Sequence, residues 1–133
     1  MKYIPQYITA IIVFFAIDLV WLNVVAKSFY RDQIGHLLRD SFLAAPAIIF
    51  YLLFLVGLLI FAVLPGLQAD SVAKAATLGA LFGFFTYATY DFTNLATLKD
   101  WPVLVTAVDL VWGSFLSGTV STLVFIISKK FGW

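Results

Sequence analysis

Four long apolar stretches, separated by short polar segments, run through the chain. Each is close to the roughly 20 residues that a helix needs to cross a hydrocarbon core of about 30 Å. The pattern therefore predicts an all-α integral membrane protein, a four-helix bundle forming a single domain over residues 1–133. The expected spans are residues 4–26, 42–64, 73–98 and 102–128, with an interfacial segment at 28–39.

Short segments between the spans carry signals of their own. The 28–39 connector alternates apolar and basic positions at helical spacing, which predicts an amphipathic segment lying in the membrane interface, although Gly35 weakens a helix there. Pro65-Gly66 is expected to end the second span, and Pro102 to open the fourth. The first span is longer than a signal-peptide core and carries polar residues, so we expect it to be retained.

Small residues at four-residue spacing mark one face of each of the last two spans. Such faces let helix backbones approach closely in lipid, and the connection between these spans is very short. We therefore expect an antiparallel hairpin. The small residues are Ala75, Gly79 and Gly83 in the third span and Gly113, Ser117 and Ser121 in the fourth.

Composition agrees with a membrane environment. Hydrophobic residues make up 63% of the chain and charged residues 11%, where a soluble domain carries about 25% charged residues. A net charge of +1 without a basic run gives no basis for nucleic-acid binding, and the absence of cysteine excludes disulfides and thiolate chemistry. Four Lys or Arg side chains flank the spans on each side, so the charge count predicts no orientation. They are Lys2, Lys74, Lys129 and Lys130 against Lys27, Arg31, Arg39 and Lys99.

Three aspartates, Asp18, Asp91 and Asp109, lie inside the apolar stretches. Because the fourth helix would run opposite to the first and third, all three are expected in one leaflet, roughly 6–10 Å from the midplane. A charge at that depth costs at least about 2.5–3.5 kcal/mol, and Asp is too short to reach the interface. We therefore expect the carboxyl groups to turn inward and share one polar pocket, where they are protonated, hydrated or bound to a cation.

The second half of the third span is dense in polar side chains. Tyr87, Tyr90, Asp91 and Asn94 share one stripe at helical spacing. Such groups also serve plain interhelical hydrogen bonding, worth about 0.6 kcal/mol on average, but an intramembrane ionisable residue marks a functional site by default. Four threonines are expected beside the stripe: Thr86, Thr89, Thr93 and Thr97.

The sequence Asp-Leu-Val-Trp occurs twice, ending at Trp21 and at Trp112. An inverted repeat would carry the second Asp into the opposite leaflet, so we interpret the repeats as two Asp/Trp pairs that line the pocket. The alternative for the tryptophans is an interfacial belt, and it is stronger for Trp21. The candidate ligand-binding residues are Asp18, Trp21, Asn23, Tyr87, Tyr90, Asp91, Asn94, Asp109 and Trp112, and the three aspartates are also the catalytic candidates.

Carboxylates beside an amide offer oxygen ligands to a hard divalent cation such as Mg²⁺, Ca²⁺ or Mn²⁺, although the spacing of Asp18, Asp91, Asn94 and Asp109 is not diagnostic. His36, the single histidine, lies in the connector and gives no support for a catalytic triad or a histidine-rich metal site.

The run from Tyr90 to Pro102, with both Asp-Leu-Val-Trp sequences, resembles a family of small bacterial inner-membrane proteins catalogued as domain of unknown function 2177. The resemblance covers essentially the whole chain. It implies a multi-pass protein of four spans in the bacterial inner membrane, and it assigns no catalytic role to any residue.

Three functions remain open at this point, beside the plainest alternative of a structural subunit or assembly partner, which the small-residue faces of the last two spans favour. The leading hypothesis is a pocket that binds a cation or a lipid-like amphipathic molecule among membrane lipids. The second is a small proton-coupled transporter working as a homodimer. The third is a lipid-modifying enzyme using paired carboxylates as acid and base.

Overall fold

The computed structural model describes all 133 residues, and the chain is helical throughout, with no strand. Two of the long helices contain a π-helical turn, and a short 3₁₀ turn follows the connector helix. In chain order the elements are α1 (Ile4–Val20), η1 (Trp21–Val25), α2 (Lys27–Ile34), η2 (Gly35–Leu37), α3 (Ala44–Leu58), η3 (Leu59–Val63), α4 (Leu64–Gln68), α5 (Val72–Thr97) and α6 (Val103–Phe131).

Three stretches are long and apolar enough to cross a membrane: Ile4–Val25, Ala44–Gln68 and Val103–Phe131. Helix α5 has 26 residues, which at 1.5 Å per residue is also sufficient in length, but it does not reach the same apolarity. The polar residues of its second half lower its hydropathy. By length and composition, the number of spans that stand out is therefore three rather than the expected four.

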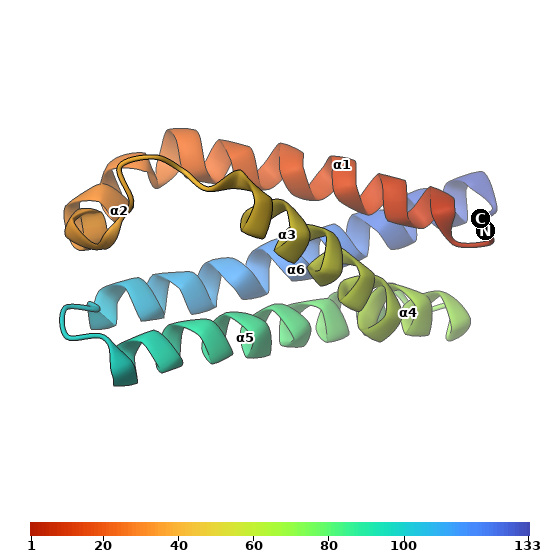
Figure 1. The fold of residues 1–133 in the computed structure, drawn as a ribbon. Coiled ribbons are helices and arrows are strands. Elements are labelled where there is room, and N and C mark those ends of the chain that lie inside the picture. Colours follow the sequence, from red (N-terminus) through yellow and green to blue (C-terminus); the bar gives the residue numbers. More distant parts are fainter.

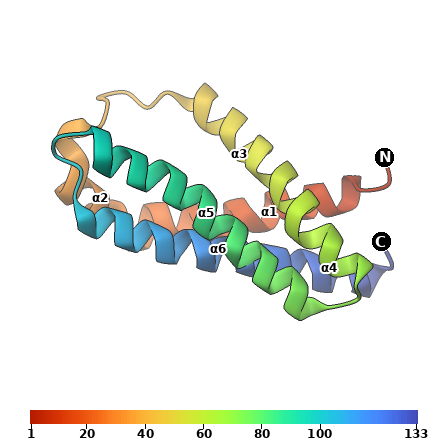
Figure 2. The ribbon, with the colours of Figure 1, turned by 90° about the horizontal axis from the view of Figure 1, so that it is seen from below.

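Both termini lie at one end of the molecule, and α2 and the α5–α6 turn lie at the other (Figure 1). Helix α1 runs antiparallel to α6, which in turn runs antiparallel to α5. Seen from below, α3 diverges from α5 and α6 toward its own start and meets them at η3 and α4 (Figure 2).

The expected hairpin of the last two long helices is present, and its small residues bring the backbones together. A Cβ on Gly83 would lie 2.0 Å from the carbonyl oxygen of Gly113, and a Cβ on Gly79 would lie 2.6 Å from the Cβ of Ser121. The Ser121 hydroxyl donates to the carbonyl of Ala75 at 2.7 Å. Because neither glycine leaves room for a methyl group, the approach of α5 to α6 depends on them.

The expectation that Pro65 and Gly66 end the second span is wrong. The helix continues through them to Gln68, by way of the π-helical turn η3. That turn resets the hydrogen-bond pattern, so Pro65 falls in the first turn of α4, where a missing N–H has little cost.

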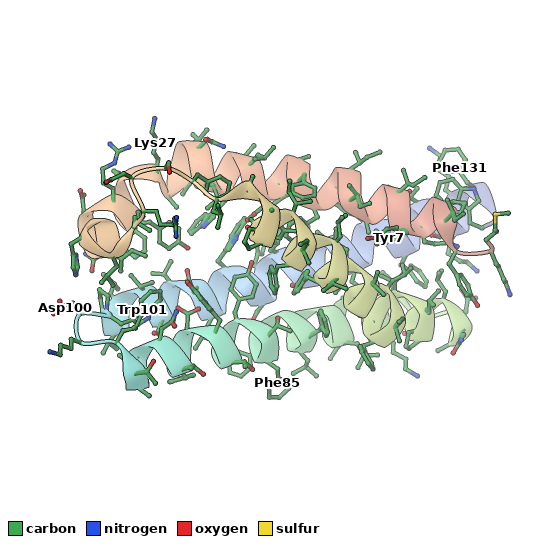
Figure 3. The ribbon with its side chains drawn as sticks, viewed as in Figure 1. Tyr7, Lys27, Phe85, Asp100, Trp101 and Phe131 are labelled. Atoms are coloured by element: carbon green, nitrogen blue, oxygen red, sulfur yellow. The ribbon has the colours of Figure 1, made fainter.

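A central apolar core joins α1, α3, η3 and α6, with Phe14, Leu55, Leu58 and Leu116 fully enclosed. The outer surface is apolar as well. Phe85, for example, points away from the other helices in Figure 3 and is 63% exposed. Large exposed apolar surfaces of this extent suit lipid rather than water as the surrounding solvent.

The amphipathic connector forms helix α2, which ends at Ile34 next to Gly35. A second, smaller core holds α2 against the α5–α6 turn and consists of Ile34, Trp101 and Val105, with Tyr30 and Leu95 packed on it. Asp100 and Trp101 mark this turn at the left of Figure 3. Helix α2 therefore closes the end of the molecule opposite the termini.

Candidate functional site

The three aspartates of the long helices all face the interior near the α2 end. Asp18 of α1 is 4% exposed, Asp91 of α5 is 0% exposed and Asp109 of α6 is 6% exposed. None of the carboxyl groups lies on the outer surface, which agrees with the desolvation cost expected for them.

Residues of one Asp-Leu-Val-Trp sequence contact residues of the other across the antiparallel helices. The indole N–H of Trp112 donates to Asp18 at 3.3 Å, so the second motif's tryptophan serves the first motif's acid. The rings of Trp21 and Trp112 stack face to face, with centroids 4.3 Å apart and planes 10° from parallel. An antiparallel pair of identical motifs thus forms one aromatic and acidic unit between α1 and α6.

Tyr30 links the remaining two residues of the motifs, Trp21 and Asp109. The indole N–H of Trp21 donates to the Tyr30 hydroxyl at 3.3 Å, and that hydroxyl donates to a carboxyl oxygen of Asp109. Burial first, and then the hydrogen bond to Asp109, raise the pKa of Tyr30 above its ordinary value of 10.0. The phenol therefore stays protonated and remains a donor through the neutral range.

Sequence reasoning missed Tyr30 as a site residue. Its position on the apolar side of an interfacial segment suggests only a packing role. The signal that could have found it is its hydroxyl on the face of the connector that must cover the buried acids.

Asp91 lies next to Asp109 but receives no hydrogen bond from any donor at either carboxyl oxygen. The hairpin register explains the pairing. Opposed positions step by four residues from Gly83 opposite Ser117, through Tyr87 opposite Gly113, to the two acids. The same small-residue stripes that bring the helices together therefore bring the two carboxyl groups together.

The remaining predicted site residues are less tightly joined. The ring of Tyr87 is half-buried and covers Gly113, where a Cβ would lie 2.3 Å from it. Tyr90 is 57% exposed and packs edge-on against Trp101, while Asn94 is partly buried. Asn23 is exposed and bonds the carbonyl of Leu19 in its own helix, outside the network of aspartates.

The α5 threonines lie away from Asp91, beyond Tyr90 at the edge of the polar stripe. The hydroxyls of Thr86, Thr89 and Thr97 bond the preceding turn of α5. Thr86 bonds the carbonyl of Phe82 at 2.8 Å, and Thr89 that of Phe85 at 2.7 Å. The hydroxyls of Thr86, Thr89 and Thr97 are therefore satisfied within the helix.

The three acids do not meet at one point. No three His, Cys, Asp or Glu side chains are arranged to hold a metal ion together. Asp18 bonds Trp112, whereas Asp109 bonds Tyr30. Two defined cavities, of about 370 and 190 Å³, lie away from the acids. The structure joins the acids through hydrogen bonds and a ring stack, and the shared pocket that the sequence suggests stays a prediction.

A family model described as "Predicted membrane protein (DUF2177)" matches residues 3–126, nearly the whole chain. The chain belongs to this family. Every residue of the network, from Asp18 to Trp112, lies in the part of the DUF2177 protein that the family model covers. No curated protein and no solved structure matches the chain. The DUF2177 protein is accordingly a membrane protein, and its function has to be argued from the network itself.

Proposed function

We propose that the protein spans the membrane four times, in the inner membrane of a bacterium. The support for a fourth span is geometric. Helix α5 lies along α6, and the contact runs from Ala75 and Ser121 to the acids near the far end. If α6 crosses the bilayer, α5 must lie at the same depths. An even number of crossings also suits two termini at the same end of the molecule.

Within that membrane domain, the proposed function is to bind a cation, or the cationic head of a lipid-like amphiphile, at the buried carboxyl pair in exchange for a proton. The observation that carries this proposal is Asp91, which is fully buried, receives no hydrogen bond and lies beside a second carboxyl group. Two ionised carboxylates side by side in a low-dielectric interior repel each other strongly and lack compensation. A proton or another cation must therefore accompany the pair.

The hydrogen bonds indicate where the proton resides when no other cation is bound. Asp109 already accepts from Tyr30, which suits an ionised carboxylate. Asp91 has no donor, so it satisfies an oxygen best by carrying the proton and donating to Asp109. An entering cation would displace that proton and restore the same net charge.

Access to the pair is gated by aromatic side chains. Tyr30 and Trp21 cover Asp109 from the α2 end, and Tyr90 lies half-exposed beside Asp91. Since aromatic faces attract cations, a lipophilic cation would find both a charge partner and apolar walls. Movement of α2 would open this route, because Tyr30 belongs to α2.

Equilibrium dialysis of the full chain in detergent, with tetraphenylphosphonium or Na⁺ as probe, tests the proposal. We expect saturable binding of at least one probe, release of a proton on binding, and tighter binding as the pH rises. Asp91→Asn and Asp109→Asn should weaken binding at least about tenfold. Asp100→Asn, which removes an exposed acid at the same end, should bind as the wild type does. Equal binding by all four proteins would refute the proposal.

Proton-coupled transport by a homodimer is a second candidate, favoured by the π-helical turns in two apolar helices, α1–η1 and α3–α4. Such turns recur at functional sites and give a helix an alternative hydrogen-bond pattern. Vesicles containing the protein should then acidify or alkalinise their lumen when a gradient of the bound cation is applied. Binding without any proton flux would leave the protein as a binding protein only.

A further inference from the structure

A separate cavity opens at the end of the molecule that carries the termini, far from the acidic network. Its volume is about 190 Å³, the space of roughly six water molecules. Residues from α1, α4 and both chain ends line it, including Lys2, Gln6, Gln68 and Trp133. That volume is small for a drug-sized molecule but sufficient for a compact polar group.

Gln6 is the unusual residue in this cavity. Its side chain is only 2% exposed, and its amide oxygen is sealed from solvent with no hydrogen-bond donor. A buried amide oxygen without a partner costs about 1–3 kcal/mol. Gln6 belongs to the four-residue stripe of α1 that continues with Ala10 and Phe14, so an apolar residue would suit its position equally well. The retained amide therefore points to a partner that supplies a donor.

One charged side chain lines the cavity, and its charge is positive. Lys2 lines it and has no acidic partner, whereas Lys129 at the same end is neutralised by Asp70 at 2.7 Å. Lys130 adds a further positive charge nearby in sequence. An ammonium group beside two carboxamides favours a ligand that combines an anion with a hydrogen-bond donor.

The remaining lining is apolar and aromatic, with Tyr3, Leu64 and Trp133. Tyrosine and tryptophan are typical of the level at which lipid headgroups meet the hydrocarbon. A ligand seated here would have its polar part in the cavity and its apolar part against the outer surface of the helices.

We propose that this cavity binds the headgroup of an anionic phospholipid, with its phosphate on Lys2 and the Gln6 amide, turned toward the cavity, accepting from a headgroup hydroxyl. Phosphatidylglycerol has this chemistry, because its headgroup carries both a phosphate diester and free hydroxyls. Phosphatidylcholine has the phosphate but no donor, so it should bind more weakly. The lipid occupies the leaflet on the side of the termini, independently of any cation at the acids.

Native mass spectrometry of the detergent-purified full chain tests this assignment. Wild type should retain phosphatidylglycerol in preference to phosphatidylcholine. Gln6→Leu and Lys2→Gln should each reduce its retention about tenfold. Gln6→Leu also removes a buried unpartnered amide, so it should fold at least as stably as the wild type. Lys130→Gln removes the same charge outside the cavity lining and should retain the lipid as the wild type does.

Two results would overturn the proposal. Equal loss in Lys2→Gln and Lys130→Gln, with no effect of Gln6→Leu, would show attraction by net charge alone. Displacement of the lipid by sn-glycerol 3-phosphate at equal concentration would assign the cavity to a soluble phosphate instead of a lipid. Both readouts are independent of Asp91 and Asp109, so they do not depend on the cation-binding proposal.

Discussion

Tyr30, in the short helix between the first two long ones, donates a hydrogen bond to Asp109, which lies 79 residues further along the chain. This bond fixes the connector helix α2 to a buried acid. The indole N–H of Trp21 donates to the same hydroxyl, so Tyr30 connects Trp21 to Asp109 through two successive hydrogen bonds. The closure of the α2 end and the state of the acidic pair are therefore linked through one phenol.

Tyr30→Phe should lower the free energy of unfolding by about 1–3 kcal/mol, because it leaves a buried carboxylate without its donor. Thermal unfolding in detergent, followed by circular dichroism, measures the change. Tyr3→Phe, a surface change at the other end, is the control and should have an effect within about 0.5 kcal/mol. Two equal effects would mean that the Tyr30 hydroxyl contributes nothing specific.

The Tyr30 phenol should not ionise where ordinary tyrosines do. Its folded-state pKa is raised above 10.0, so its stabilising bond is fully present below about pH 10 and is lost only as the pH rises toward the raised value. Tyrosinate absorbance should therefore rise equally in wild type and Tyr30→Phe up to about pH 11. If the wild type showed one more phenol titrating near pH 10 than Tyr30→Phe does, the result would contradict the placement of Tyr30 beside Asp109.

Gly83→Ala should push apart the two helices of the hairpin, α5 and α6. Its Cβ would meet backbone atoms of α6, which cannot move aside as a flexible side chain can. We expect destabilisation of about 1–3 kcal/mol or failure to fold, measured by the same unfolding experiment. Gly35→Ala is the matched control, because its Cβ would lie 3.7 Å from Arg31 and its backbone is helical. It should be neutral or stabilising.

The stacked Trp21 and Trp112 should show energetic coupling. A double-mutant cycle with Trp21→Leu and Trp112→Leu should give an interaction energy of about 0.5–1.5 kcal/mol. Trp112 lies in the first half of α6, whereas Trp133 follows its end. The same cycle between these two residues should therefore give no interaction energy. Equal couplings in the two cycles would indicate a general effect of removing indole rings.

Much of the fold could be predicted from periodicity and small residues. The hairpin followed from Gly79 and Gly83, because only a close backbone approach explains such spacing in apolar helices. The path of the chain through Pro65 could not be predicted, since it depends on a π-helical turn that packing stabilises. The apolar pattern predicts α5 as a fourth span, but length and composition single out only three helices, because the polar residues of α5 lower its hydropathy.

The inward orientation of the aspartates could also be predicted, because desolvation leaves few alternatives. Their partners could not. Spacing within one helix groups Asp18 with Trp21, whereas the structure bonds Asp18 to Trp112 of another helix. The hydrogen bond from Tyr30 to Asp109 and the lack of a donor at Asp91 both depend on the register between elements. Local patterns in the sequence do not contain that register.

Infrared spectroscopy of the protonated carboxyl C=O stretch shows whether the Asp91–Asp109 pair holds one proton and on which residue. Near neutral pH, we expect a protonated carboxyl band in the wild type that disappears in Asp91→Asn, whose amide can still donate to Asp109. A wild-type spectrum without this band, or a band that survives unchanged in Asp91→Asn, would contradict this expectation.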